Sequence, residues 1–446
     1  MFEFFIMTGL AVLFFGNPVY SNTTDKNVRV NKTPSFNVSN TQDISQAVPI
    51  EKKLVPSDPQ SNARFGSAVG VWENRALISA KNRNNPEDQS GAVYAYEFDG
   101  ANWIQTQKIN ASDAAAFDGF GYSISMNANR ALISSASPVN GIQSGAVYYY
   151  ENVDGFWEEK QKFSSSDGVL GDRFGISMEL DGDRAIFGAI YDDENENDSG
   201  SAYIFEFNGN QWTEVQRLNA NDASDNDRFG YSVSLSGNNA LVSAILDDDN
   251  GSASGSAYVF KFNGKAWVQD QKLTPTDGST NDRFGISSTI NGNNILVGSS
   301  FSDTSGLDSS GSAYIFEFDG KNWIEKQKLF SGDPSAEDNF GDSVSLNKSR
   351  ALVSAPGTSY NVDPLPGYVY VYDFNGVNWY LSHILTASDR EEGDMYGSDT
   401  SLFGNTALIG DFLNEDAYID SGSSYIYSLP VNPFERIYMD GFEGEK

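Results

Sequence analysis

An aromatic residue followed by glycine recurs seven times along the 446-residue chain, and this repeat constrains the fold more than any other feature of the sequence. Successive pairs lie 54 to 56 residues apart. Self-similarity at such a period is typical of solenoids, propellers and arrays, in which one supersecondary unit is copied. We therefore expect one repeat domain rather than three unrelated domains of average length. The pairs are Phe65-Gly66, Phe120-Gly121, Phe174-Gly175, Phe229-Gly230, Phe284-Gly285, Phe340-Gly341 and Tyr396-Gly397.

Each copy contains the pattern of four short strands. In the copy that begins at Phe229, apolar or alternating segments cover 231–235, 240–244, 256–262 and 267–273. Tight turns separate the first strand from the second and the third from the fourth, whereas a longer polar loop joins the second to the third. Four antiparallel strands per copy form a blade. The sequence therefore predicts an all-β fold, a seven-bladed β-propeller of four-stranded antiparallel blades.

Other aromatic residues keep the same phase in every copy. A tyrosine lies three residues after a glycine in each third strand, and a tryptophan opens the fourth strand of six copies. Bulky residues are needed between the faces of neighbouring twisted sheets, so we interpret these rings as blade packing rather than as ligand contacts. The phenylalanine of each pair is expected to fill the gap between blades, where its glycine lets the backbone pass closely.

The two ends of the repeat region predict how the ring closes. The seventh copy stops at Pro430 and lacks the tryptophan strand that ends each earlier copy. Upstream of the first copy, residues 50–54 match 268–273, and Ser57-Asp58 matches Thr276-Asp277. We therefore expect an N-terminal strand to complete the last blade, which removes an open sheet edge. The propeller should cover residues 47–429.

The segments outside the propeller indicate export. Residues 4–15 are apolar, about as long as the core of a signal peptide and too short to span a bilayer, and small residues precede position 22. The segment departs from a typical signal peptide because it carries Glu3 and has no Lys or Arg before the apolar run. We predict a signal peptide over 1–21, a flexible leader over 22–46, and a C-terminal tail over 430–446. The protein would then be secreted or held at a bacterial cell surface.

The amino-acid composition limits which classes of partner the protein can bind. A formal net charge of −32 repels nucleic acid and anionic lipid surfaces, so we expect no nucleic-acid partner and no membrane insertion of the mature chain. Cations, basic partners and neutral sugars remain open, and the acidity could equally serve only solubility. The absence of cysteine excludes disulfides and thiolate chemistry.

These residues resemble the FG-GAP repeat family, the bacterial relatives of the integrin α-subunit β-propeller. The aromatic-glycine pairs, the segment 351–356 (ALVSAP) in place of the "GAP" element, and the run 367–372 (GYVYVY) carry the resemblance. It implies a secreted or cell-surface propeller used for adhesion or ligand binding and often holding calcium. The expected partner is an extracellular protein or glycan.

The chain departs from integrin-type repeats in where its acidic residues lie. Those repeats place a calcium cage between the first two strands of a blade, but here these connections are short turns such as 181–184. Acidic residues gather instead in the other connections, which leave one face of the disc. The candidate calcium ligands are Asp192, Asp193, Asp198, Asp247, Asp248 and Asp249.

Two further sets of aspartates are regularly spaced. They could bind a hard cation or could cap turns by bonding the backbone, and the sequence leaves both readings open. One set lies seven residues before the aromatic of each pair: Asp58, Asp113, Asp167, Asp222, Asp277, Asp333 and Asp389. The other lies two residues before it: Asp118, Asp172, Asp227, Asp282, Asp338 and Asp394.

The sequence contains no clear pattern of catalytic residues. The single histidine, His383, occupies a strand position held by glutamine in neighbouring copies, which excludes Ser-His triads and His-ligated zinc. No carboxylate pair breaks the repeat as a glycosidase dyad would. Trp72 falls at the first hairpin turn and could contact a ligand or pack there. We expect a non-catalytic binding or adhesion module; the alternative is a propeller hydrolase acting on a polysaccharide or phosphoester through its acidic loop face.

Overall fold

The computed structural model describes residues 47–434, apart from 85–86, 137–144, 194–195, 305, 333 and 358–366. The predicted signal peptide, the leader, Asp333 and most of the C-terminal tail lie outside the described residues. Every named element of the described part is a β-strand. A search of that part for a helix with the length and hydropathy of a membrane span finds none.

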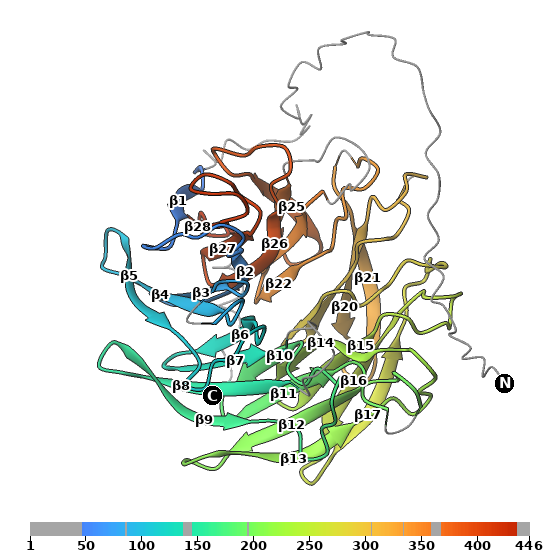
Figure 1. Ribbon diagram of the computed structural model, residues 1–446. Coiled ribbons are helices and arrows are strands. Elements are labelled where there is room, and N and C mark those ends of the chain that lie inside the picture. The colour runs from blue at the N-terminus through green and yellow to red at the C-terminus, as the bar shows by residue number, and fades with distance from the viewer. Residues whose placement is uncertain are drawn as a thin grey trace, which may run out of the picture. The chain divides into compact units, whose positions relative to one another are not determined.

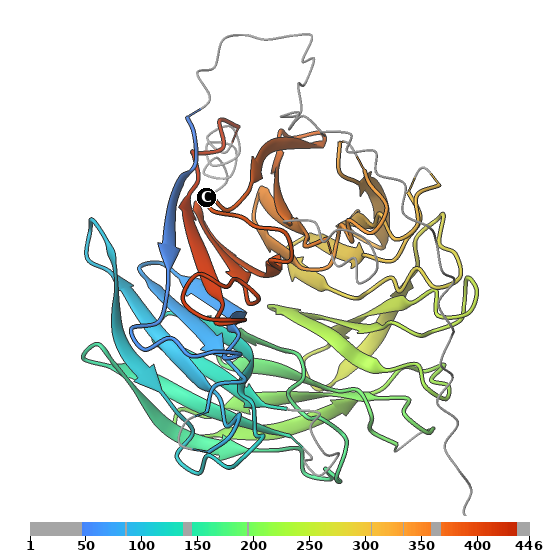
Figure 2. The ribbon, with the colours of Figure 1, turned by 45° about the horizontal axis from the view of Figure 1, so that its top comes forward.

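Seven sheets of four antiparallel strands are arranged in a ring, as the repeat predicts (Figures 1 and 2). The first strands of neighbouring blades contact one another all the way round, so they line the centre. These inner strands are β2 (Phe65–Trp72), β6 (Phe120–Asn127), β10 (Met178–Asp181), β14 (Phe229–Ser236), β18 (Ser288–Asn291), β22 (Val344–Asn347) and β26 (Tyr396–Phe403).

The remaining strands follow outward in each sheet. The second strands are β3 (Arg75–Ala80), β7 (Arg130–Ser135), β11 (Arg184–Ala189), β15 (Asn239–Ala244), β19 (Asn294–Ser299), β23 (Arg350–Ala355) and β27 (Thr406–Asp411). The third are β4 (Ala92–Phe98), β8 (Ala146–Val153), β12 (Ser201–Phe207), β16 (Ser256–Phe262), β20 (Ser312–Phe318), β24 (Tyr368–Phe374) and β28 (Ser423–Ser428). The outer strands are β5 (Trp103–Ile109), β9 (Phe156–Phe163), β13 (Trp212–Leu218), β17 (Trp267–Leu273), β21 (Trp323–Leu329), β25 (Trp379–Leu385) and β1 (Ile50–Leu54).

This order gives the disc two different faces. We call the loop face the one with the connections between second and third strands and between blades, such as 245–255 and 219–228 in the fourth copy. The turn face carries the tight hairpin turns, such as 237–238 and 263–266. Because antiparallel strands alternate in direction, both kinds of loop-face connection leave from the same end of each blade.

The N-terminal strand closes the ring, as the sequence predicts. The strand β1 pairs with β28 along its whole length, from Ile50 opposite Ser428 to Leu54 opposite Ser424. Figure 1 shows the blue β1 beside the red β28. The side chain of Glu51 also accepts hydrogen bonds from the hydroxyls of Ser388 at 2.6 Å and Tyr427 at 2.8 Å. Strands from the two ends of the chain therefore form one blade.

The aromatic-glycine pairs pack as predicted. The ring of Phe65 is fully buried and meets Tyr94 of the third strand edge-on, with centroids 5.5 Å apart. Its partner Gly66 has a φ of +95°, and a Cβ there would lie 2.4 Å from the carbonyl oxygen of Ser423 in the preceding blade. Only glycine tolerates both the positive φ and this approach. The same aromatic contact recurs in all seven blades.

Glutamines in the outer strands join neighbouring blades. The side chain of Gln107 donates to the carbonyl of Trp157 at 2.9 Å and accepts from its N–H at 2.7 Å. The tryptophan ring then packs against apolar residues of the preceding blade, which confirms its predicted role in packing. Equivalent pairs are Gln161–Trp212, Gln216–Trp267, Gln271–Trp323 and Gln327–Trp379.

The single histidine takes the glutamine position in the sixth blade. His383 lies in β25, as expected, and its Nε2 is 3.4 Å from the carbonyl oxygen of Ala47, just before β1. It therefore makes the corresponding link to the N-terminal segment that completes the seventh blade. Burial lowers the pKa of His383 below its ordinary value. A neutral ring in this position bridges two blades instead of acting as a base.

Candidate functional site

The described aspartates that lie seven residues before a pair are bound within their own blade. The carboxylate of Asp277 accepts from the hydroxyl of Tyr314 at 2.9 Å and from the ammonium of Lys328 at 2.7 Å. Although burial alone would raise it, these bonds hold the pKa of Asp277 below its ordinary value. The same Asp–Tyr–cation unit occurs as Asp58–Tyr94–Lys108, Asp113–Tyr148–Lys162, Asp167–Tyr203–Arg217 and Asp389–Tyr425–Lys53.

The aspartates two residues before each pair cap turns, one of the two readings that the sequence left open. The carboxylate of Asp118 accepts the backbone N–H of Ala115 at 2.7 Å. Each carboxylate holds its loop through the backbone N–H three residues earlier, as Asp side chains do in turns. The same bond is made by Asp172, Asp227, Asp282, Asp338 and Asp394.

The blade formed by β14 to β17 brings three carboxylates together around a lysine. Oxygens of Asp222, Asp247 and Asp249 lie within 4.8 Å of one another. The ammonium of Lys272 lies 2.8, 2.9 and 2.6 Å from oxygens of these three groups, respectively. Burial alone would lower the pKa of Lys272, but hydrogen bonds and charge from the three carboxylates raise it above its ordinary value. We call this set the Lys272 cluster.

The Lys272 cluster does not fit a calcium ion as it stands. Asp247, which is 4% exposed, also accepts the hydroxyls of Ser256 at 2.9 Å and Tyr258 at 2.7 Å. The predicted ligand Asp248 instead accepts the backbone N–H of Ala253 at 2.7 Å. Calcium takes six to eight oxygens, and a charged ammonium already occupies the centre of this group. Asp247 and Asp249 are two of the three predicted ligands in this loop. Together with Asp222 they surround the ammonium of Lys272, a cation that the protein itself supplies.

The blade formed by β10 to β13 carries the other predicted ligands on one loop. Asp192 is buried and accepts the hydroxyl of Tyr203 at 2.5 Å. Asp193 is exposed, and its carboxylate accepts the backbone N–H of Asp198 at 2.7 Å. Partial burial and the nearby charge of Asp193 raise the pKa of Asp198. Burial and the charges of Asp192 and Asp193 likewise raise the pKa of Asp172 to about 6. Negative charges therefore repel one another in this loop.

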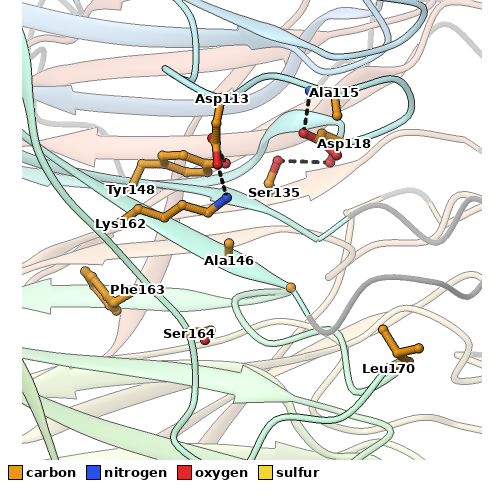
Figure 3. A pocket seen from close by; sticks show the side chains of 11 residues that line it. Asp113, Ala115, Asp118, Ser135, Ala146, Tyr148, Lys162, Phe163, Ser164 and Leu170 are labelled. Atoms are coloured by element: carbon orange, nitrogen blue, oxygen red, sulfur yellow. Dashed lines mark hydrogen bonds and ion pairs between the residues drawn. The ribbon is translucent and has the colours of Figure 1, made fainter.

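A hollow of about 560 Å³ opens on the loop face beside the second blade (Figure 3). Figure 3 shows Asp113, Tyr148 and Lys162 pointing toward one another on one side, with Leu170 on the other. Lys162 lies 2.5 Å from a carboxylate oxygen of Asp113. Lys162 compensates the charge of Asp113, whereas Asp118, the third charged residue of the lining, leaves the hollow with one formal negative charge.

At the turn face the inner strands surround a second hollow of about 260 Å³, lined by residues of all seven blades. Trp72 ends β2 beside it and stacks on Phe403, with ring centroids 4.5 Å apart. Trp72 therefore packs at the turn, as one of its two predicted roles requires, and it also lines the hollow, so its predicted ligand contact stays untested. Glu179 and Asp181 also line the hollow, where burial and the charge of Asp181 raise the pKa of Glu179 to about 7.

The basic partners of the repeated aspartates were missed by the sequence analysis. They were detectable, because a Lys or Arg stands one residue before the last residue of six of the seven outer strands. When the copies are aligned on the aromatic-glycine pair, the basic residue recurs at one position in six copies, as the aspartate does in all seven, and this shared recurrence predicts that they pair. The aspartates seven residues before the pairs, which have so regular a set of basic partners, are better interpreted as members of ion pairs than as metal ligands.

Comparison with known families agrees with this architecture. The model of the FG-GAP repeat matches seven segments: residues 50–96, 103–150, 157–205, 212–260, 267–316, 323–372 and 379–427. Each segment starts in the outer strand of one blade and ends in the third strand of the next. No curated protein is significantly similar to the chain.

Proposed function

The chain belongs to the FG-GAP repeat family, and from this we propose that it is a non-catalytic binding or adhesion module, secreted or held at the cell surface. The propeller is a common protein-binding fold. Residues that bind a partner are commonly carried on loops that a rigid scaffold positions. The loop face, where the long connections gather around the hollow of Figure 3, is the surface we assign to the partner, an extracellular protein or glycan.

The observation that carries this proposal is the internal pairing of the aspartates that lie seven residues before the aromatic-glycine pairs. A glycosidase needs two carboxyl groups at the substrate, one of them protonated near neutral pH. Here Asp58, Asp113, Asp277 and Asp389 each have a lowered pKa and a basic partner. Carboxylates held in this way stiffen loops and are poorly placed for acid catalysis. This supports binding over hydrolysis.

A glycan and protein array probed with residues 22–446 tests the proposal. We expect saturable binding to one class of ligand, and no turnover when the same protein is screened against glycosidase, esterase and phosphodiesterase substrates. Metal-dependent turnover that is lost when Asp192 and Asp193 become Asn would overturn the proposal and establish the hydrolase alternative.

We further propose that calcium stabilises the loop of the third blade, where Asp192, Asp193 and Asp198 concentrate negative charge. A bound cation would remove the repulsion between these groups. In millimolar calcium the melting temperature should rise above that in matched magnesium or chelator, at about 0.15 M salt to suppress general screening. Filling a site to about a hundred times its Kd stabilises a fold by about 2.7 kcal/mol.

Two variants locate the effect. Asp193→Asn with Asp198→Asn should abolish the response to calcium, because it removes two charges from that loop. Asp248→Asn, which changes an equally exposed aspartate beside the Lys272 cluster, should leave the response intact. Identical melting curves in all three buffers would mean that the acidic loops bind no calcium and serve only to keep the protein soluble.

A further inference from the structure

Four arginines occupy the same position in four copies, directly before the aromatic-glycine pair. They are Arg64, Arg173, Arg228 and Arg283, and each has a φ between +51° and +59°. This left-handed conformation is unfavourable for a residue with a side chain, so the fold holds each arginine in a specific direction. The other three copies have Gly119, Asn339 and Met395 at this position.

Each guanidinium lies over an aromatic ring. Arg64 lies 5.5 Å from the ring centroid of Phe412, and Arg283 lies 4.3 Å from that of Phe301. Arg173 and Arg228, from adjacent blades, both lie over Tyr191, at 4.7 and 5.2 Å. A cation–π contact uses the flat face of the guanidinium. Its N–H donors, which lie in the plane of the group, remain available.

The four arginines gather around the loop-face end of the central channel. They precede the inner strands, which line that channel. The charges of Arg228, Arg283 and Asp342 all act on the hydroxyl of Tyr231, although Asp342 belongs to a blade two positions away. On the other side, the charges of Arg64 and Asp399 act on Lys81. The four arginines and Lys81 therefore place five cations around this opening. The carboxylates of Asp342 and Asp399 lie there as well.

Within the described residues no ion pair joins these four arginines to a carboxylate, although the charge of Arg228 acts to lower the pKa of Asp198. Other arginines form such pairs: Arg130 binds Asp183 at 2.6 Å, and Arg184 binds Glu206 at 3.1 Å. In a chain with 61 acidic and 29 basic side chains, unpaired arginines are unexpected. The Nε atoms of Arg64 and Arg228 are also buried without a hydrogen-bond partner, as are those of Arg75 and Arg83, which form ion pairs with Glu97 and Asp58. A buried donor left unsatisfied is costly and calls for an explanation.

We propose that this opening, the arginine mouth, binds an anionic group that presents several oxygens: a carboxylate, a sulfate or a phosphate. Guanidinium donors match the oxygens of such groups in pairs, which a lysine cannot do. The proposal goes beyond the binding role assigned to the loop face, since it names a second site and the chemistry of its ligand. The net charge of the protein repels anions in general, but at the centre of the loop face the arginines would attract one.

Two carboxylates in the channel give the arginine mouth a pH dependence. Burial raises the pKa of Asp342 to about 6, where it accepts from Ser300, and that of Asp399 to about 6, where it accepts the N–H of Val69 and faces Lys81. Both carboxylates become neutral as pH falls below 6, while burial lowers the pKa of Lys81 only to about 8. The opening therefore gains positive charge on acidification, and a bound anion should be held more tightly.

Sulfate is a suitable probe because its charge is constant across this range. Calorimetric titration of residues 22–446 with sodium sulfate, at ionic strength fixed with NaCl, should give saturable binding that tightens from pH 7.5 to pH 5.5. Replacing Arg173 and Arg228 by Gln should weaken binding at least tenfold. The Arg→Lys pair at the same positions keeps the charge but loses the paired donors, so it should bind with intermediate affinity.

The control is Arg130→Gln with Arg184→Gln. It removes the same charge from arginines that also lie over aromatic rings but already bind carboxylates. This variant should bind sulfate like the unchanged protein. Parallel titrations with phosphate and with glucuronate show which oxygen-bearing group is preferred. Equal loss in both glutamine variants, or no saturable binding of any of the three anions by the unchanged protein, would overturn the proposal without bearing on the array experiment.

Discussion

Removal of residues 22–58 is expected to leave a protein that is largely insoluble or destabilised on the order of 5 kcal/mol. The deletion takes β1 away from β28 and so exposes five residue pairs of sheet edge. It also removes Leu54, which is 5% exposed in the core between the last blade and the first, and the contacts of Glu51 with Ser388 and Tyr427. Urea unfolding and the soluble fraction after expression measure the effect.

Removal of residues 22–44 is the matched control, because it stops short of β1 and should leave stability and solubility unchanged. Proteins of both lengths that unfold at the same urea concentration as the intact chain would mean that β1 contributes little to the ring.

Lys272→Met is expected to destabilise the protein by about 3 kcal/mol at pH 7.5. It leaves Asp222, Asp247 and Asp249 facing one another without their cation. The loss is smaller than for a fully buried charge, since the side chains of Asp222 and Asp249 are about half exposed. Equilibrium unfolding in urea measures it.

The pH dependence of this loss has a definite sign. With Lys272 present, its hydrogen bonds and charge keep the pKa of Asp247 below the ordinary value despite burial, so this carboxylate stabilises the fold above pH 4 and loses that effect on acidification. In the variant the mutual repulsion of the carboxylates raises their pKa values instead. The difference between the two proteins should therefore shrink from pH 7.5 to pH 4.5.

Two comparisons separate the Lys272 cluster from a simple ion pair. Lys328→Met removes the equivalent lysine of the next blade, which binds Asp277 alone, and should cost about 1 kcal/mol or less. Calcium should restore part of the stability of Lys272→Met, because the vacated centre is then lined by carboxylate oxygens alone. Equal losses in the two lysine variants would contradict the special role of the cluster.

The repeat made the fold predictable, whereas contacts between repeat positions had to be seen in the structure. Phe65 and Gly66 reveal their role in the sequence because a buried ring and a backbone approach each restrict a single position. The closing strand was also predictable, since it matches the outer strand of other copies. The length of the inner strands was less predictable: β10 begins four residues after Phe174, whereas β2 begins at Phe65 itself, although the glycine after each ring has a positive φ.

The charged sites depend on distances that the sequence does not contain. Asp247 and Lys272 lie in a loop and in an outer strand, and only the folded blade brings the ammonium within 2.9 Å of the carboxylate. The sequence of this loop therefore predicts a candidate metal site, whereas the folded blade places the ammonium of Lys272 among its carboxylates. The arginine mouth was missed for a similar reason, because Arg64, Arg173, Arg228 and Arg283 come to lie around one opening only when the blades form a ring.

Ring closure also fixes an order of events in time. Lys53 pairs with Tyr425, 372 positions further along (425 minus 53), so the first strand to be synthesised is among the last to be paired. The entropy of joining such distant segments grows only slowly with their separation, so length adds little to the cost. Timing is what matters: β1 has no partner until β28 exists. A chain that terminates early keeps an unpaired strand at one end and an unfinished blade at the other, which makes closure a test of full-length synthesis.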